Sequence, residues 1–185
     1  MRQRPSIRLR LMTIEDTEKI VTWRNRDFVR KNFIYQEPFT AEGHLSWIRE
    51  QVETGRVVQF IICLSDGREI GSVYFRDIDR ENGEAEYGIF IGEETALGCG
   101  YGTETAKQAL AYAFTQLKLH KVFLRFLSDN ISAMKSYEHA GFLLTDRKES
   151  VMTRQGVREV RFMELDDAAW RQAAHDGGLE RKANE

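Results

Sequence analysis

The sequence predicts one α/β domain, built on a mixed, mostly antiparallel central sheet of six to seven strands flanked by helices. Three observations predict it: strand-like and helix-like patterns follow one another in a set order, short polar turns separate three successive strand patterns, and a glycine-rich turn precedes a long helical pattern. The 185 residues suit one domain, because typical domains hold about 100–200 residues. We expect this domain over residues 1–166 and a polar C-terminal tail over 167–185.

In the first half, residues 7–12 alternate apolar and polar side chains, which is typical of a half-buried strand. Thr13 precedes Asp16 by three residues, as at the start of a capped helix. Thr40 opens a second helix, which Gly55 ends. Strand patterns follow at 57–64, 70–78 and 84–91, and the short polar turns between them favour an antiparallel meander.

In the second half, a long helical pattern covers 102–118, an apolar strand 122–127 and a short helix 132–139. A hairpin of 142–150 with 157–165 then turns around Gly156. The resulting order, βααβββαβαββ, describes a single sheet with helices on its faces. The polar tail is compatible with a helix, and we expect it to fray near Gly177 and Gly178.

The composition excludes several classes of partner. The chain is 42% hydrophobic and 11% aromatic, enough to bury a core, and its net charge is −2. This balance offers no general attraction for nucleic acid or an anionic membrane. No apolar run approaches the roughly 20 residues of a membrane span, so we expect a cytoplasmic protein. Cys63, Cys99 and four scattered histidines form no disulfide framework and no metal site, and Cys63 is expected in the core.

The glycine-rich turn Gly98-Cys99-Gly100-Tyr101-Gly102-Thr103 stands between an apolar strand and a long helix. There, backbone N–H groups and the helix dipole can converge on a phosphate. Turn glycines are common, so the turn alone does not establish such a site. A P-loop would need lysine after the last glycine, where Thr103 stands, and a dinucleotide fingerprint would follow the first strand of a parallel unit.

A second motif runs from Asn130 to Phe142, just after the strand at 122–127. Asn130 suits a helix cap, and Tyr137 lies two turns further along the same helix face. A hydroxyl at that position can point back toward the end of the strand. From this segment alone, Tyr137 fits the role of a packing aromatic at least as well.

Together, the glycine turn, helix, strand and the pattern Asn-x-x-Ala-x-x-x-Tyr-x-x-x-Gly-Phe resemble the GNAT acyltransferase family over residues 7–165. The resemblance implies a V-shaped splay between the fourth and fifth strands, which holds the pantetheine arm of acetyl-CoA. It implies transfer of the acetyl group to a primary amine. Tyr137 matches the family's general acid, which protonates the departing thiolate.

The resemblance also implies cofactor contacts, at Leu97, Gly98, Cys99, Gly100, Tyr101, Gly102, Thr103, Asn130 and Ala133. Leu97 stands where the family often has Gln or Arg, so we expect weaker side-chain support there. An alkyl amine is mostly protonated at neutral pH and must lose this proton before it attacks the thioester, so a general base is needed. Glu86 resembles the family's base, and Glu84 on the same strand face competes with it. Both could instead be solvated carboxylates.

For the acceptor, Trp23-Arg24-Asn25 and Val29-Arg30-Lys31 are similar to a branch of ribosomal-protein N-terminal acetyltransferases and amino-sugar-nucleotide N-acetyltransferases. This similarity implies that Arg24, Arg30, Lys31, Phe33 and Tyr87 bind the acceptor, a nucleotide-linked amino sugar, with Phe28 or Tyr35 as further stacking candidates. A solvated basic helix face explains the same residues equally well.

Other interpretations stay open. The acceptor could be a peptide N-terminus or a polyamine, the latter if Glu37, Glu42, Glu81 and Glu84 form an acidic patch. The chain could also bind acetyl-CoA without catalysing transfer, since a fold can persist after its chemistry is lost. A homodimer is one expected assembly.

Overall fold

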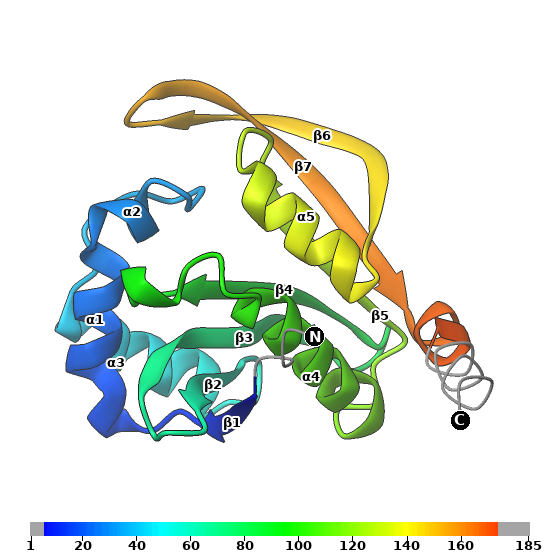
Figure 1. Cartoon of the computed structure of the whole chain (residues 1–185), viewed down its shortest axis with the longest axis horizontal. Coiled ribbons are helices and arrows are strands. Elements are labelled where there is room, and N and C mark those ends of the chain that lie inside the picture. The colour runs from blue at the N-terminus through cyan, green and yellow to red at the C-terminus, as the bar shows by residue number, and fades with distance from the viewer. Residues whose placement is uncertain (1–5, 174–185) are drawn as a thin grey trace.

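The computed structural model describes residues 6–173, and its core is one seven-stranded sheet in the order β1-β2-β3-β4-β5-β7-β6 (Figure 1). Neighbouring strands are antiparallel except β4 and β5, which are parallel. The predicted mixed, mostly antiparallel fold class is therefore confirmed. The strands are β1 (Ile7–Leu11), β2 (Val58–Leu64), β3 (Glu69–Asp79), β4 (Glu84–Ile91), β5 (Lys121–Leu127), β6 (Leu143–Thr153) and β7 (Gly156–Asp166).

The helices occur in the predicted order, with small differences at their ends. They are η1 (Ile14–Asp16), α1 (Thr17–Asn25), α2 (Asp27–Arg30), α3 (Ala41–Trp47), the π-helical η2 (Ile48–Val52), η3 (Glu94–Ala96), α4 (Tyr101–Thr115) and α5 (Ile131–Ala140). The carboxylate of Asp16 accepts from the Thr13 N–H at 2.8 Å, and Thr40 caps α3 through the N–H of Gly43. The helix predicted over 102–118 ends early, at Thr115.

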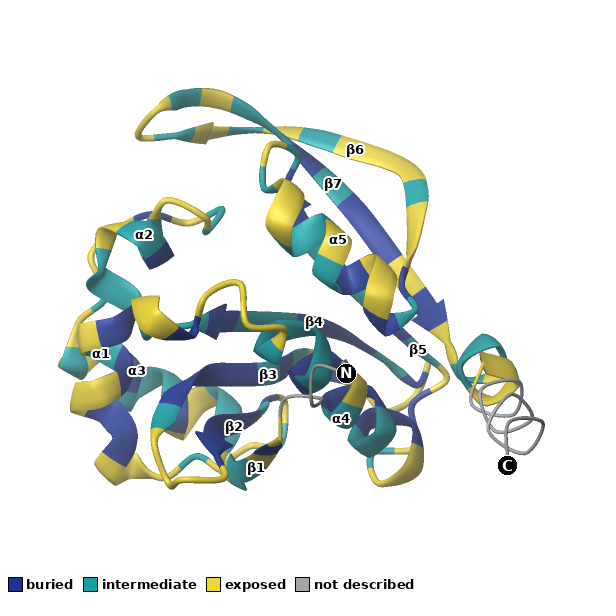
Figure 2. Cartoon of the chain, in the orientation of Figure 1, coloured by how far each residue is buried: buried dark blue, intermediate teal, exposed yellow. Residues whose placement is uncertain are grey.

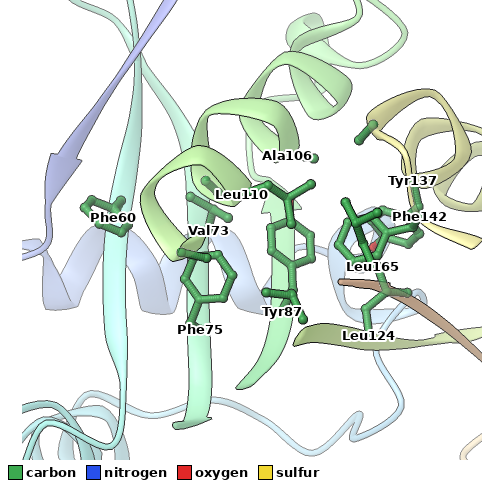
Figure 3. Packing of buried hydrophobic residues seen from close by; sticks show 14 of the residues in the cluster. Phe60, Val73, Phe75, Tyr87, Ala106, Leu110, Leu124, Tyr137, Phe142 and Leu165 are labelled. Atoms are coloured by element: carbon green, nitrogen blue, oxygen red, sulfur yellow. The ribbon is translucent and has the colours of Figure 1, made fainter. Parts of the chain in front are cut away.

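The two faces of the sheet are covered by different helices. Ile20, Trp23 and Val29 of α1 and α2 pack against one face, in a cluster that includes Phe90 and the buried Cys63. On the other face, α4 packs against strands β1, β3 and β4, and Figure 3 shows Ala106 and Leu110 above Val73, Phe75 and Tyr87. Because successive strand residues point to opposite faces, Phe90 and Tyr87 of β4 face different helices.

The sheet opens between its two parallel strands. β4 and β5 pair only at Glu84–Lys121, Ala85–Val122 and Glu86–Phe123. Both strands continue past these pairs, but β5 keeps its pairing with β7 over its whole length. The parallel strands therefore diverge from Glu86 onward, as Figure 1 shows, and this is the V-shaped splay that the sequence resemblance implies.

The start of the predicted polar tail is ordered against the core. Residues 167–173 are helical, and the ring of Trp170 lies 5.4 Å from that of Phe114 in α4. The expected fraying near Gly177 and Gly178 lies outside the described residues. Within residues 6–173, no helix is long and apolar enough to cross a membrane. Figure 2 shows the buried strands and helix faces around the splay, beside the largely exposed β6.

Candidate active site

A cleft of about 540 Å³ lies at the splay between β4 and β5. Its lining comes from α2 and the loop after it, from β3 and β4, from the glycine turn, and from the end of β5 together with α5. The size is that of a small-molecule site. Eight of the nine expected cofactor residues line this cleft: Leu97, Gly98, Gly100, Tyr101, Gly102, Thr103, Asn130 and Ala133. The ninth, Cys99, is exposed and is not among the lining residues of the described chain.

Residues of the glycine turn line the cleft at the start of the 15-residue helix α4. Gly98 has φ 71° and Gly100, the N-cap, has φ 83°, a left-handed conformation that favours glycine. The first N–H groups of a helix have no acceptor within it, and the helix dipole makes this end attractive to an anion. At Gly98 an added Cβ would meet no atom within 4 Å, so the turn is open to a ligand. These features fit a pyrophosphate.

Helix α5 is positioned by Asn130 and by a contact with α4. The Asn130 side chain accepts a hydrogen bond from the Ala133 N–H at 3.2 Å, which confirms the predicted cap. The hydroxyls of Thr103 and Ser136 lie 3.1 Å apart and join the glycine turn to α5. One turn beyond Ala133, Tyr137 lines the same cleft.

Tyr137 is 9% exposed and sits in a cage of aromatic rings. Its ring centroid lies 6.0 Å from that of Phe126 and 6.1 Å from those of Tyr87 and Phe142. Figure 3 shows Tyr137 with Tyr87 and Phe142. Burial raises the pKa of Tyr137 well above the usual value of about 10. A tyrosine hydroxyl is protonated at neutral pH even at its usual pKa, so it can donate a hydrogen bond there.

Tyr87 brings a second hydroxyl to this region. Its side chain is 2% exposed and lines the cleft, yet its hydroxyl has no hydrogen-bond partner among the described residues. Burial, with a smaller contribution from Tyr137, raises its pKa well above 10. The sequence predicts that Tyr87 binds the acceptor, but it packs on the α5 side of the sheet, beside Tyr137.

Glu86 lines the cleft but is engaged in an ion-pair network. Its Oε1 accepts from Arg76 Nη2 at 2.9 Å and from Arg125 Nε at 3.1 Å, while its Oε2 accepts from Arg125 Nη2 at 3.2 Å. The sequence patterns single out neither arginine. Arg125 could have been noticed, because it is a charge inside the apolar strand 122–127. Glu84, the alternative candidate for the general base, pairs with Lys121 at 2.7 Å and does not line the cleft of the described chain.

The basic segment does not assemble as expected. The Arg24 guanidinium lies 3.3 Å from the centre of the Phe33 ring, and burial lowers its pKa to about 10, so it stays charged. Arg30 pairs with Asp27 at 3.3 Å. In the described structure, neither Arg24 nor Arg30 lines the cleft, whereas Lys31 and Phe33 do. Of the three cations, only Lys31 therefore lines the cleft of the described chain, and binding of an acceptor phosphate by the trio stays a prediction.

The acidic patch considered for a polyamine does not reach the cleft either. Glu37 pairs with Arg154 at 3.1 Å, and Glu42 and Glu81 are exposed. In the described chain, none of the four glutamates considered for this patch lines the cleft: Glu37, Glu42, Glu81 and Glu84. In residues 6–173, no group of three or more His, Cys, Asp or Glu side chains is placed to hold a metal ion.

A splayed sheet, an amide-rich turn at a helix N-terminus and a buried tyrosine on one cleft define the class of CoA-dependent acyltransferases. A family model described as an acetyltransferase (GNAT) domain matches residues 6–143. This chain belongs to the GNAT acetyltransferases, as its motifs predict, and is an acetyl-CoA-dependent N-acetyltransferase.

Two relatives illustrate the similarity in sequence. A spermidine N(1)-acetyltransferase of Escherichia coli K12 is 32% identical over 137 residues, which cover 74% of this chain and 73% of that protein. An uncharacterized protein of Methanocaldococcus jannaschii is 30% identical over 143 residues, 75% of this chain, but the match spans only 28% of that protein's length.

Among solved structures, the chain is similar to spermidine N-acetyltransferase from Vibrio cholerae in complex with CoA and spermine. The TM-score is 0.81 at 22% identity, covering 89% of this chain and 97% of that one. A likeness at this identity shows the fold.

Proposed function

We propose that the cleft between β4 and β5 is where this enzyme transfers an acetyl group to a primary amine, with Tyr137 donating a hydrogen bond to the departing sulfur. The observation that supports this most strongly is the position of Tyr137. It is buried, and it lines the same cleft as the glycine turn. Acetyl-CoA supplies the acetyl group as a thioester; the other roles below belong to the chain's own residues.

Donor binding is assigned to the glycine turn and α5. The amides around Gly98, Gly100 and Gly102 face the cleft at the positive end of α4 and suit a pyrophosphate. Asn130 acts indirectly, because its side chain caps α5 and so fixes where Tyr137 stands. The exposed Leu97 adds no charge, which leaves the binding to main-chain groups.

The role of Glu86 is revised by its contacts. Both carboxylate oxygens already accept hydrogen bonds from guanidinium groups. To take a proton from an amine directly, Glu86 would have to give up at least one of them. We therefore assign Glu86 to holding Arg76 and Arg125 in place, and we assign removal of the amine proton to water in the cleft.

The acceptor is the least determined part. By sequence similarity alone, the spermidine N(1)-acetyltransferase of Escherichia coli favours a polyamine over a nucleotide-linked amino sugar, but the cations that line the cleft oppose a polycation. The amino-sugar hypothesis loses the support of Arg24 and Arg30, which do not line the cleft of the described chain. A peptide N-terminus remains a third candidate.

The test is thiol release from acetyl-CoA over a panel of spermidine, a peptide with a free N-terminus and a nucleotide-linked amino sugar, with product mass checked for each. Acetylation of one amine well above the others assigns the acceptor. Calorimetric binding of acetyl-CoA without turnover of any amine would favour a non-catalytic binding module.

Self-association is a separate proposal, supported by the β6–β7 hairpin. Met152 and Val157 are cross-strand partners, so they lie on one face of the hairpin, and they are 75% and 65% exposed. Exposed apolar pairs on an edge hairpin are costly in water and suit a second copy of the chain. Light scattering should report a dimer or larger assembly that Met152→Lys weakens; a monomer at micromolar concentration would refute this.

A further inference from the structure

The acceptor side of the cleft is positively charged. Away from the glycine turn and α5, the lining comes from α2 and its following loop, β3, β4 and the end of β5, and it carries three cations, Lys31, Arg76 and Arg125. Glu86 is the only acidic lining residue in the described chain. One carboxylate thus faces three positive side chains.

The two arginines are held side by side with donors to spare. Glu86 bonds to both guanidinium groups, and Asp77, which does not line the cleft of the described chain, forms a longer and more exposed ion pair with Arg76, so Glu86 is the carboxylate that balances the two arginines inside the cleft. Nε of Arg76 is buried and has no hydrogen-bond partner among residues 6–173. Asp77 is 3.7 Å from this nitrogen, too far for a hydrogen bond. Two guanidinium groups held in place, with N–H groups that Glu86 does not use, are suited to binding a carboxylate or a phosphate.

Aromatic residues complete this side of the cleft. Tyr74 and Arg76 are two residues apart on β3 and so share its face with Glu86, the cross-strand partner of Arg76. The Tyr74 ring lies over Gly88, where an added Cβ would come within 2.3 Å of it. Phe33 and Tyr35 also line the cleft, from the loop after α2, and the Tyr35 side chain is a hydrogen-bond partner of Arg125. These rings can hold the apolar body of a small molecule while the arginines hold its charge.

We propose that the acceptor amine carries an acidic group, a carboxylate or a phosphate, which binds to Arg76 and Arg125 while its amine reaches the splay. The inference rests on the proposed acetyl transfer and names the class of acceptor. A polyamine is disfavoured because it brings additional ammonium groups against two guanidinium groups. Lys135 also lines the cleft, but it lies on α5 beside Ser136, which contacts the glycine turn. We therefore assign Lys135 to the binding of acetyl-CoA and not to the acceptor.

The experiment measures thiol release with amines matched in pairs. Glucosamine 6-phosphate is compared with glucosamine, 4-aminobutanoate with butylamine, and spermidine serves as the polycation. We expect at least one acidic amine to exceed its uncharged partner and spermidine by about 10-fold or more in kcat/KM. Which pair shows the preference distinguishes phosphate from carboxylate.

Variants assign the effect to residues. Arg76→Gln and Arg125→Gln should each raise the KM of the preferred acidic amine about 10- to 100-fold, with little change for its uncharged partner or acetyl-CoA. Arg68→Gln is the matched control, because Arg68 pairs with Asp66 at 2.8 Å on an exposed turn. Thermal unfolding of each variant checks that the fold survives, and Lys in place of either arginine should restore part of the affinity.

The outcomes are distinct. Turnover that favours spermidine or the uncharged amines overturns the inference while leaving acetyl transfer intact. So does an acidic preference that neither arginine variant reduces in a folded protein. Absence of turnover with every amine, including peptides, counts against the proposed function itself.

Discussion

Replacing Glu86 by glutamine separates two roles that this residue could play. As a general base, Glu86 would remove the amine proton, and its loss should lower kcat by about 10²- to 10⁴-fold. As the residue that holds Arg76 and Arg125, it matters chiefly for the geometry and stability of the site. The contacts favour the second role, because both carboxylate oxygens are occupied.

The size of the stability effect follows from these contacts. The amide oxygen of glutamine can replace Oε1, which accepts at 2.9 and 3.1 Å, but its NH₂ group would face Arg125 Nη2 where Oε2 accepts at 3.2 Å. One charge-assisted hydrogen bond is lost and two are weakened, at about 1.5–3 kcal/mol for each such bond to a charged group. We expect the free energy of unfolding to fall by about 2–4 kcal/mol.

The assay is kcat against pH at saturating amine, alongside chemical unfolding. We expect Glu86→Gln to keep kcat within about 10-fold of wild type and to keep the shape of the pH profile. Glu84→Gln is the control, because Glu84 forms a half-exposed pair with Lys121 that contributes less than about 1 kcal/mol. If a folded Glu86→Gln variant instead turns over about 100-fold more slowly and loses the acidic limb of the profile, the anchoring role is refuted.

Three further predictions concern other parts of the molecule. In calorimetry, Gly102→Val should weaken acetyl-CoA binding far more than Cys99→Ala. Even a Cβ at Gly102 comes within 3.2 Å of Ser136 Oγ, whereas Cys99 does not line the cleft of the described chain. Equal effects of the two substitutions would show that the pyrophosphate binds elsewhere. Burial lowers the pKa of His44 to about 4, so between pH 6.5 and 4 only the unfolded chain takes up a proton on this ring. The free energy of unfolding should therefore fall by about 3 kcal/mol from pH 6.5 to pH 4, and His44→Asn should remove this fall. If the variant loses stability with pH as steeply as the wild type, the prediction is wrong. Tyr87→Phe deletes a buried hydroxyl without a partner in residues 6–173 and should stabilise the free protein by about 1 kcal/mol; a loss of stability would show that the hydroxyl is satisfied.

Much of the fold could be predicted because local patterns carry it. Alternation marks the strands, the spacing of Thr13 and Asp16 marks a helix start, and the glycine turn lies before α4 as its residues indicate. The cap at Asn130 follows from residue type alone. The pattern places the end of α4 three residues late, at 118, because apolar spacing continues after the helix ends at Thr115.

The acceptor side could not be predicted in the same way, because strand register creates it. Arg76 lies opposite Glu86 across β3 and β4, and Arg125 comes from β5, 39 residues further on than Glu86. No local pattern reports such neighbours. The sequence does not show which way Arg24 points for a related reason. A cation among aromatic residues can stack on them inside the protein, as Arg24 does on Phe33, as readily as it can face a ligand.

The most direct test of the central claim is Tyr137→Phe, measured for turnover and for acetyl-CoA binding on the same preparation. The substitution keeps the ring that packs against Phe126 and Phe142 and removes only the hydroxyl. We predict that kcat falls by about 10- to 10⁴-fold on the best amine while the Kd for acetyl-CoA changes by less than about 3-fold. Full turnover in the variant, or a loss confined to acetyl-CoA affinity, would contradict the assignment of Tyr137 as the group that assists departure of the thiolate.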